Sequence, residues 1–165
     1  MEAETIIKLV YQKDFEALKK VLSQGTNLNV SDSDGRTPLM HAVLDSNADD
    51  EMVKFLLKNG AEPNSQDISQ KWTALHFATR DQKLKIVSTL LDGGAIVDTK
   101  DSFGNTPLWR CVMESNAKPE LIKLLVDSGA SPLTANALGV SPLQLAEKMG
   151  RGTDLLSILE SSKAS

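Results

Sequence analysis

Two histidines and one cysteine are the side chains of this sequence best suited to catalysis or metal binding. A catalytic histidine needs a nucleophile or a carboxylate within hydrogen-bond reach. Helical spacing offers one such pairing, His41 with Asp45, four residues apart on one face of a helix. No phosphate-binding glycine loop, H-E-x-x-H motif or C-x-x-C motif accompanies it. We therefore expect no enzyme activity, and an enzymatic hypothesis would require turnover that is lost when His41 and Asp45 are replaced.

Metal and cofactor sites are equally unsupported. Two histidines and one cysteine cannot close a four-ligand shell, so we expect no metal site and no cofactor. Cys111 has no second cysteine with which to form an internal disulfide. Its position favours a small buried side chain, and the alternative is a reactive thiol.

Charge and hydropathy exclude two classes of partner. The 18 Lys and Arg residues against 22 Asp and Glu residues give a net charge of -4, without the basic surface that nucleic acid requires. The N-terminus has no signal-peptide pattern, and no run of 18 apolar residues follows. These observations predict a cytoplasmic protein that binds neither nucleic acid nor a membrane. The length of 165 residues suits a single domain.

The elements that carry these residues recur along the chain. One motif contains Thr-Pro-Leu or a close variant, and its Thr or Ser falls at Thr37, Thr73, Thr106 and Ser141, in steps of 36, 33 and 35 residues. A Leu-Leu pair followed by Gly-Ala comes at a regular distance after three of the copies, ending at Ala61, Ala95 and Ala130. Thr followed by Pro is a strong signal for the start of a helix, and the later Gly is typical of a helix end.

A period near 33 residues built on Thr-Pro-Leu-His-x-Ala resembles the ankyrin-repeat family. The resemblance implies an all-α solenoid of about five helix-turn-helix units with short β-hairpin-like turns. It also implies that His76, the one histidine kept in the motif, ties neighbouring turns together through ring hydrogen bonds. The predicted single domain spans 1–165, with units at about 1–31, 32–66, 67–100, 101–135 and 136–165.

The segments between the two helices of each unit alternate in length. Residues 46–51 and 115–120 are two residues longer than their counterpart in unit three, and they lie 69 positions apart. Units two and four therefore look like copies within a doubled ancestral pair.

The helical phase of each first helix separates a core face from an exposed face. With the Thr or Ser as position zero, positions +2, +5 and +6 share one face, which is Leu108, Cys111 and Val112 in unit four. Positions +4, +7 and +8 point the other way, into the concave groove implied by the resemblance. The candidate partner contacts there, with Tyr11 from the first unit, are Tyr11, His41, Leu44, Asp45, Phe77, Arg80, Asp81, Arg110, Met113 and Glu114. The alternative for Leu44, Phe77 and Leu145 is packing within the stack.

The turns between units supply the remaining candidates, because in the resembled family they project toward ligands. The candidate contacts in these turns and directly after them are Arg36, Ile68, Trp72, Phe103, Asn105 and Trp109. We expect Ile68, Trp72, Phe103 and Leu138 to form an exposed apolar ridge. The turn of unit three has one extra residue and no Gly, which predicts that it bulges and pushes Trp72 outward. Trp109 replaces the motif's His, so it either braces the next turn or contacts a ligand.

These patterns predict a non-catalytic protein-binding module that is monomeric when free. Residues 104–110 together with 139–146 resemble small bacterial ankyrin proteins that occur with polymorphic toxins. That resemblance implies an immunity protein, which inhibits a toxin enzyme by binding it. The alternative is a general adaptor, scaffold or regulatory subunit in a cytoplasmic complex. A single tight partner favours immunity, and several weak partners favour an adaptor.

Overall fold

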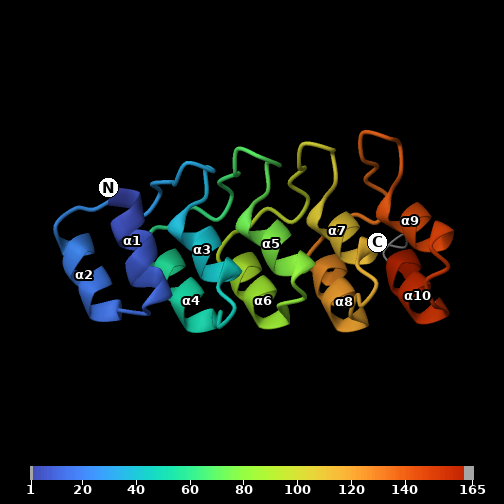
Figure 1. Cartoon of the computed structure of the whole chain (residues 1–165). Helices are drawn as coiled ribbons and strands as arrows, with labels where there is room; N and C mark the ends of the chain where they lie inside the picture. Colours follow the sequence, from blue (N-terminus) through green and yellow to red (C-terminus); the bar gives the residue numbers. More distant parts are fainter. Residues whose placement is uncertain (1, 162–165) are drawn as a thin grey trace.

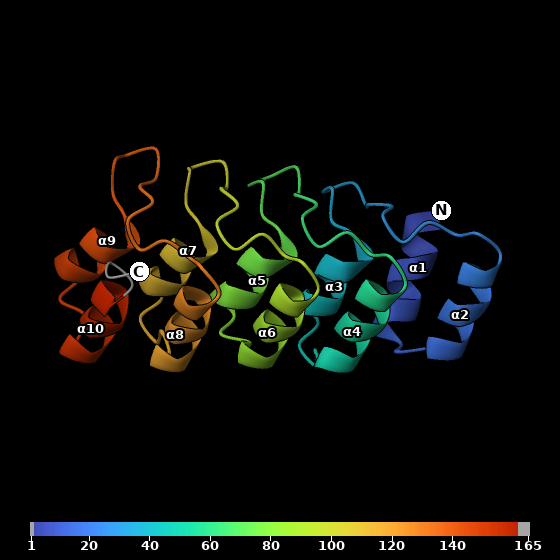
Figure 2. The same ribbon diagram turned by 180° about the vertical axis from the view of Figure 1, so that it is seen from behind.

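The computed structural model describes residues 2–161, which form ten α-helices in five antiparallel pairs and no β-strand (Figures 1 and 2). The predicted all-α solenoid of paired helices is confirmed. The first helices of the pairs are α1 (Glu2–Tyr11), α3 (Pro38–Leu44), α5 (Ala74–Arg80), α7 (Pro107–Met113) and α9 (Pro142–Lys148). The second helices are α2 (Phe15–Ser23), α4 (Asp50–Lys58), α6 (Leu84–Asp92), α8 (Pro119–Asp127) and α10 (Thr153–Ser161). Residues 162–165 of the predicted fifth unit lie outside the described residues, and the exact unit boundaries stay a prediction.

The Thr or Ser of the repeated motif caps the N-terminus of a first helix, and Pro follows at the first helical position. Thr37 is the N-cap of α3, and its hydroxyl accepts a hydrogen bond from the backbone N–H of Met40. Pro38 follows at the first helical position, where its missing N–H leaves no bond unmade. Thr106 and Ser141 repeat this arrangement at α7 and α9. Each of these copies therefore sets the start of a helix locally.

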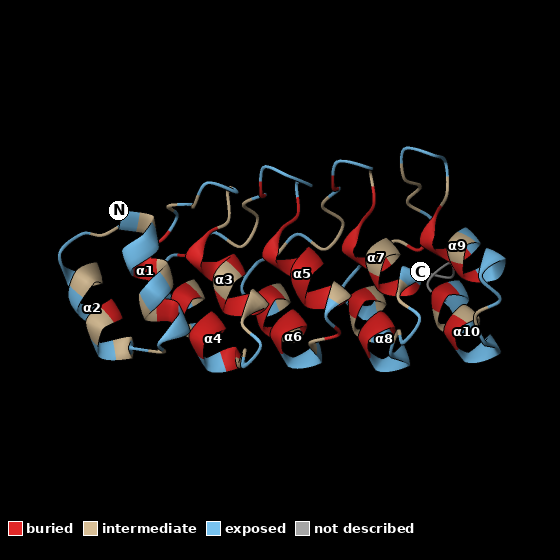
Figure 3. Ribbon diagram, viewed as in Figure 1, coloured by how far each residue is buried: buried red, intermediate tan, exposed pale blue. Residues whose placement is uncertain are grey.

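The core runs the length of the stack between the two rows of helices (Figure 3). The +2, +5 and +6 positions of the first helices are buried as predicted, with one exception. Glu147 occupies position +6 of α9 and is exposed. The first helices pack against one another in chain order, so each pair contacts chiefly its neighbours.

An Asp or Asn at the base organises each turn. Asp32 Oδ1 accepts hydrogen bonds from the backbone N–H groups of Asp34 and Arg36, both at 2.9 Å. Asp67, Asp101 and Asn136 close their own turns through equivalent bonds. Hydrogen bonds also link consecutive turns. Ile68 N donates to Asp34 O at 2.9 Å, and equivalent bonds join Ser102 N to Gln70 O and Ala137 N to Phe103 O. The turns are thus held in a fixed order along one side of the stack.

The alternation of loop lengths has a structural counterpart. The short loops of pairs one, three and five each contain a residue with positive φ, namely Lys13, Gln82 and Gly150. The longer loops of pairs two and four are held by side chains from their odd-numbered neighbours. Lys83 Nζ donates to Val43 O at 2.6 Å, and Arg151 donates to carbonyl groups at the end of α7. These cations satisfy carbonyls that a helix end leaves unpaired.

Candidate functional site

Three apolar side chains stand exposed on consecutive turns. Ile68 is 71% exposed, Phe103 is 58% exposed and Leu138 is 86% exposed. We call Ile68, Phe103 and Leu138 the turn-tip row. The hydrogen bonds between turns fix their order, since Phe103 O accepts from Ala137 N at 3.0 Å. A turn needs no such side chains for its own stability.

The predicted exposure of Trp72 is wrong, because its side chain is only 5% exposed. Lys71 adopts φ +56° in the place where Gly35, Gly104 and Gly139 have positive φ in the other turns. The register just before Thr73 is therefore kept, and the extra residue is accommodated toward the tip. The indole turns inward and donates from Nε1 to Asp101 Oδ2 at 3.2 Å. Trp72 therefore braces two helix pairs and is not available as a contact.

Phe77 and Asn105, two further predicted contacts, are also buried. The Phe77 ring packs edge-on against Trp72 at 5.1 Å between centroids, which supports the alternative that it packs within the stack. Asn105 donates from Nδ2 to Asp101, and its Oδ1 accepts from Asn136 Nδ2 at 2.8 Å. Asn105 therefore connects two turns instead of presenting its amide outward.

His41 lies between two partners, and neither is Asp45, the carboxylate that an enzymatic hypothesis would need. Its Nε2 is 2.8 Å from Asp32 Oδ2, and its Nδ1 is 2.9 Å from the Tyr11 hydroxyl. A carboxylate only accepts, so Nε2 carries a proton and donates to Asp32. Asp45 Oδ1 instead accepts from the backbone of Asn47 at 3.0 Å. The pairing of His41 with Asp45 is thus not formed.

A row of hydrogen bonds joins Tyr11, His41 and Asp32 and resembles a catalytic relay. The pKa shifts of Tyr11 and Asp32 do not favour catalysis. Burial and the nearby Asp45 charge raise the pKa of the Tyr11 phenol, which makes its anion harder to form. Burial alone would raise the pKa of Asp32, but hydrogen bonds from the Arg36 backbone and from His41 hold it below its ordinary value. These hydrogen bonds therefore connect α1 to the next turn and orient the exposed Tyr11 side chain.

His76 and Trp109 make the same bracing contact in successive pairs. His76 Nε2 donates to Asn105 O at 3.3 Å, and Trp109 Nε1 donates to Val140 O at 3.1 Å. Both bonds reach the carbonyl just before the next Thr or Ser N-cap. The role expected for His76 is confirmed, and the bracing alternative for Trp109 is present. Burial lowers the pKa of His76 to about 4, so the ring is neutral at pH 7.

Arg110 occupies in pair four the position that His41 occupies in pair two. Its Nε and Nη2 both donate to Asp101 Oδ2, at 3.0 and 2.6 Å. Burial alone would raise the pKa of Asp101, but the Arg110 hydrogen bonds and backbone N–H donors hold it below its ordinary value. Arg110 is therefore mainly a structural cation, and 17% of its side chain is exposed.

The remaining predicted residues line one side of the first helices, which we call the first-helix face. The exposed or half-buried side chains of this face are Tyr11, Arg36, His41, Leu44, Asp45, Arg80, Asp81, Arg110, Met113, Glu114, Leu145, Lys148 and Met149. Tyr11, Met113 and Met149 are its exposed large apolar members. The structure thus brings most predicted contacts onto one continuous side, next to the turn-tip row.

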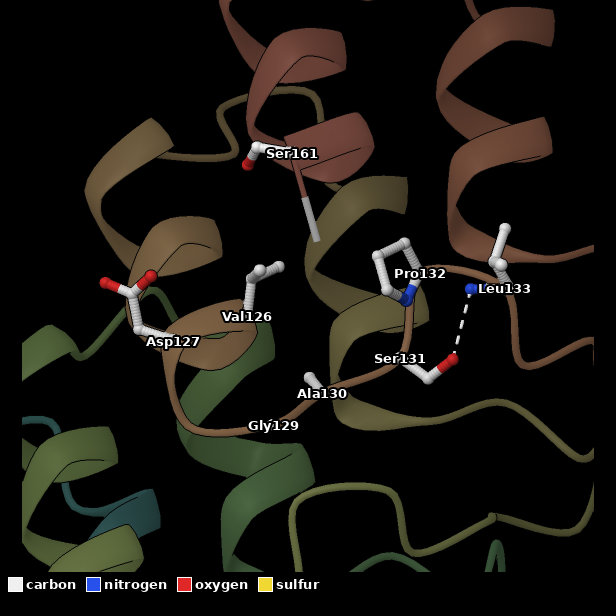
Figure 4. Close-up of a pocket in the computed structure, with 8 residues that line it drawn as sticks. All are labelled: Val126, Asp127, Gly129, Ala130, Ser131, Pro132, Leu133 and Ser161. Carbon is white, nitrogen blue, oxygen red and sulfur yellow. Dashed lines mark hydrogen bonds between the residues drawn. The ribbon is translucent and has the colours of Figure 1, made fainter. Parts of the chain in front are cut away.

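Tyr11, Asp32 and His41 line one hollow of the surface, together with Glu4 and Lys8. Another hollow lies between the ends of α8 and α10 and is lined by Val126, Asp127, residues 129–133 and Ser161 (Figure 4). Its one titratable group, Asp127, already pairs with Lys123 at 2.8 Å. Across residues 2–161, no three His, Cys, Asp or Glu side chains gather as a metal site requires. Burial raises the pKa of the Cys111 thiol to about 11, as befits a core side chain.

Two kinds of residue escaped sequence reasoning. Leu138 belongs to the predicted ridge but not to the candidate contacts, although it is the most exposed large apolar side chain among the described residues. Its equivalence to Phe103, two residues after the base of the turn, is the signal that finds it. The clamping residues Lys83 and Arg151 belong to no motif of the sequence.

Comparisons with known proteins give one consistent result. Residues 6–101 and 45–136 match the sequence model of a family described as ankyrin repeats, in three copies. The chain is 32% identical over 113 residues to ankyrin repeat and SAM domain-containing protein 6 of Rattus norvegicus, which covers 68% of this chain. It is 29% identical over 153 residues, or 90% of this chain, to the mitochondrial disaggregase of Bos taurus. It is 31% identical over 103 residues, or 62% of this chain, to an ankyrin repeat protein of Fowlpox virus.

These relatives are much longer than the region of similarity. The aligned region is 12% of the rat protein, 21% of the bovine protein and 17% of the viral protein. The similarity therefore concerns a repeat module and not the whole activity of any relative. Within the part of the chain that the structure describes, no helix is long and apolar enough to cross a membrane.

Proposed function

The chain belongs to the ankyrin-repeat family. From that premise we propose that it binds one partner protein and inhibits it by covering its active site, as a bacterial toxin immunity protein does. The family's fold is generally a non-catalytic binding fold, and protein binding is its usual role. The proposal places the contact on the first-helix face and the turn-tip row. It also describes a monomer that acts in the cytoplasm.

The distribution of exposed apolar side chains carries this proposal. Of the nine large hydrophobic residues exposed in the described structure, six belong to the first-helix face or the turn-tip row. They are Tyr11, Ile68, Phe103, Met113, Leu138 and Met149. Charged side chains of both signs surround them, including Asp81, Glu114 and Lys148. Apolar anchors within a charged surround are typical of protein interfaces.

A single such surface supports inhibition over scaffolding. An adaptor holds two proteins at once and so needs two separate contact surfaces. The exposed side chains of the second helices are mainly charged, among them Lys19, Lys54 and Lys123. Isolated surface pairs of this kind contribute little to binding energy. One partner seated on the turn-tip row and the first-helix face would leave no second apolar surface of similar extent.

The test is affinity capture with matched baits followed by an inhibition assay. The three baits are the wild-type chain, a turn-tip variant (Ile68→Ser, Phe103→Ser, Leu138→Ser) and a control with Leu84→Ser at an exposed position on α6. We expect wild type and control to retain one stoichiometric partner that the turn-tip variant loses. Adding the purified chain should then suppress the activity or toxicity of that partner.

Two results would contradict the proposal. Equal retention by all three baits would place the contact elsewhere on the molecule. Retention of several proteins whose activities are unchanged by the chain would replace inhibition with an adaptor role.

A further inference from the structure

Three arginines lie along the first-helix face and cover aromatic rings. Arg36 and Arg80 place their Cζ atoms 5.8 and 5.5 Å from the centroid of the Phe77 ring. Arg80 and Arg110 lie 5.3 and 5.0 Å from the Trp72 ring. The two rings are buried, so guanidinium groups form the surface that a partner meets over pair three. Planar guanidinium groups fixed on rings are pre-organised hydrogen-bond donors.

The Arg36 guanidinium is poorly satisfied within the fold. Its Nε is buried and has no hydrogen-bond partner among the described residues. Its one ion pair joins Nη1 to Asp34 Oδ2 at 3.5 Å, a distance too long for a strong hydrogen bond. About a third of the side chain is still exposed, so its terminal nitrogens remain reachable. The terminal nitrogens of Arg36 therefore have only one weak acceptor within the fold, and they are the donors of this side chain that a partner can reach.

Arg151 shows what a satisfied arginine looks like in this chain. Its Nε also lacks a partner, but its Nη1 and Nη2 donate to carbonyl groups of four residues at the end of α7 and in the following loop. Arg110 likewise places two of its nitrogens on Asp101. Arg110 and Arg151 therefore do not share the deficiency of acceptors found at Arg36.

Arg80 supplies a second set of open donors beside the same ring. Its Nε donates to Asp81 Oδ1 at 2.6 Å, and none of the described residues accepts from its terminal nitrogens. Asp81 also lies 3.9 Å from Lys83 Nζ, so one carboxylate is shared between two cations. The cluster of Arg80, Asp81 and Lys83 consequently keeps a net positive charge, although the whole chain carries -4.

We propose that the partner protein presents an acidic side chain that binds between Arg36 and Arg80, above Phe77. The carboxylate would accept from the open terminal nitrogens of both arginines, and the guanidinium fork suits its two oxygens. Apolar residues next to it in the partner would contact the turn-tip row. This inference rests on the proposed function and adds the chemistry that the partner must carry.

The test uses a phage-displayed library of random 16-residue peptides, panned on the full chain. We expect the enriched peptides to share an Asp or Glu close to large apolar residues. Arg36→Gln and Arg80→Gln should each weaken a synthetic enriched peptide about tenfold or more, as loss of a charge-assisted contact does. The matched control, Lys123→Gln, removes an exposed cation from α8 and should leave affinity within about twofold.

A double-mutant cycle separates a direct contact from a general charge effect. Replacing the peptide's Glu by Gln should weaken binding to wild type but not to Arg36→Gln, whose melting temperature is checked alongside. Peptides that need Phe103 and Leu138 but are indifferent to the Glu change would overturn the acidic site and leave the proposed function standing. Failure to enrich any peptide that the turn-tip substitutions weaken would count against both.

Discussion

The indole Nε1 of Trp72 donates to the Asp101 carboxylate at 3.2 Å, across the junction between the third and fourth helix pairs. Asp101 simultaneously accepts from Arg110 and from the backbone N–H groups of its own turn. One buried carboxylate therefore links a tryptophan, an arginine and a turn that come from two different pairs. The stability of this junction depends on side chains that a repeat motif does not specify.

Replacing Trp72 should destabilise the fold. We expect Trp72→Ala to lower the free energy of unfolding by about 3–5 kcal/mol, because it leaves a cavity and removes a donor from Asp101. Trp72→Phe should cost less, since a ring still fills most of the space. Urea unfolding measures both, with the exposed Phe103→Ala as the control. A change below about 1 kcal/mol for Trp72→Ala would mean that the indole is not a brace.

Acidification should weaken the fold through His76. Burial is the main cause that lowers its pKa from 6.5 to about 4, with partial compensation from the Asn105 carbonyl. Between those pH values the unfolded chain binds a proton that the folded chain does not. The free energy of unfolding therefore falls as the pH is lowered through this window, by about 3 kcal/mol in total. Carboxylates with lowered pKa, such as Asp101, lose their contribution only as the pH falls further.

Urea unfolding at pH 7, 6 and 5 measures this dependence. The free energy of unfolding should rise with pH in wild type. In His76→Gln it should rise clearly less steeply, whatever the absolute stability of the variant. Equal slopes in the two proteins would show that another group dominates the window. A ring-proton titration by NMR gives the pKa of His76 directly.

The sequence predicted the repeat fold and the core face because both depend on local, repeated signals. Thr37 caps a helix through its own backbone, and Leu108 is buried by helical phase alone. The orientation of Trp72 depends instead on the φ of Lys71 and on an acceptor, Asp101, located 29 residues further along the chain. Likewise, His41 pairs with Asp32 through the turn geometry and not with Asp45 through helical spacing. Side-chain contacts between units are not encoded by the sequence pattern of a single unit, so they could not be predicted from it.

Lys71 offers a direct test of the turn conformation. It adopts φ +56°, a region that costs a side-chain-bearing residue about 1 kcal/mol or more. We expect Lys71→Gly to raise the free energy of unfolding by roughly 0.5 kcal/mol, after the extra freedom of Gly in the unfolded chain is subtracted. Gly104→Ala should do the opposite, because its Cβ would lie 2.8 Å from the Ala137 backbone nitrogen. A destabilised Lys71→Gly protein would indicate a different turn geometry.

Leu108 tests the helical phase in a central pair. It is fully buried at position +2 of α7, and truncation should cost about 2–5 kcal/mol in chemical denaturation. The comparison is Met113→Ala on the same helix, whose exposed side chain should change stability by no more than about 0.5 kcal/mol. Similar losses of stability from the two substitutions would mean that the predicted core face of α7 is wrong.

Phe103 tests the binding surface. Its ring is mostly exposed on the turn, and the Arg110 guanidinium lies 6.0 Å from it, on the side toward the first-helix face. A large rigid side chain held by the hydrogen bonds between turns loses little entropy on binding, which favours a strong contribution if it enters a partner pocket. We expect Phe103→Ala to weaken binding of the captured partner at least tenfold, about 1.4 kcal/mol, with the melting temperature nearly unchanged. Titration calorimetry of wild type, Phe103→Ala and the control Leu84→Ala measures this difference. A lower melting temperature together with an unchanged affinity of the folded fraction would make Phe103 a brace between turns and remove it from the contact surface.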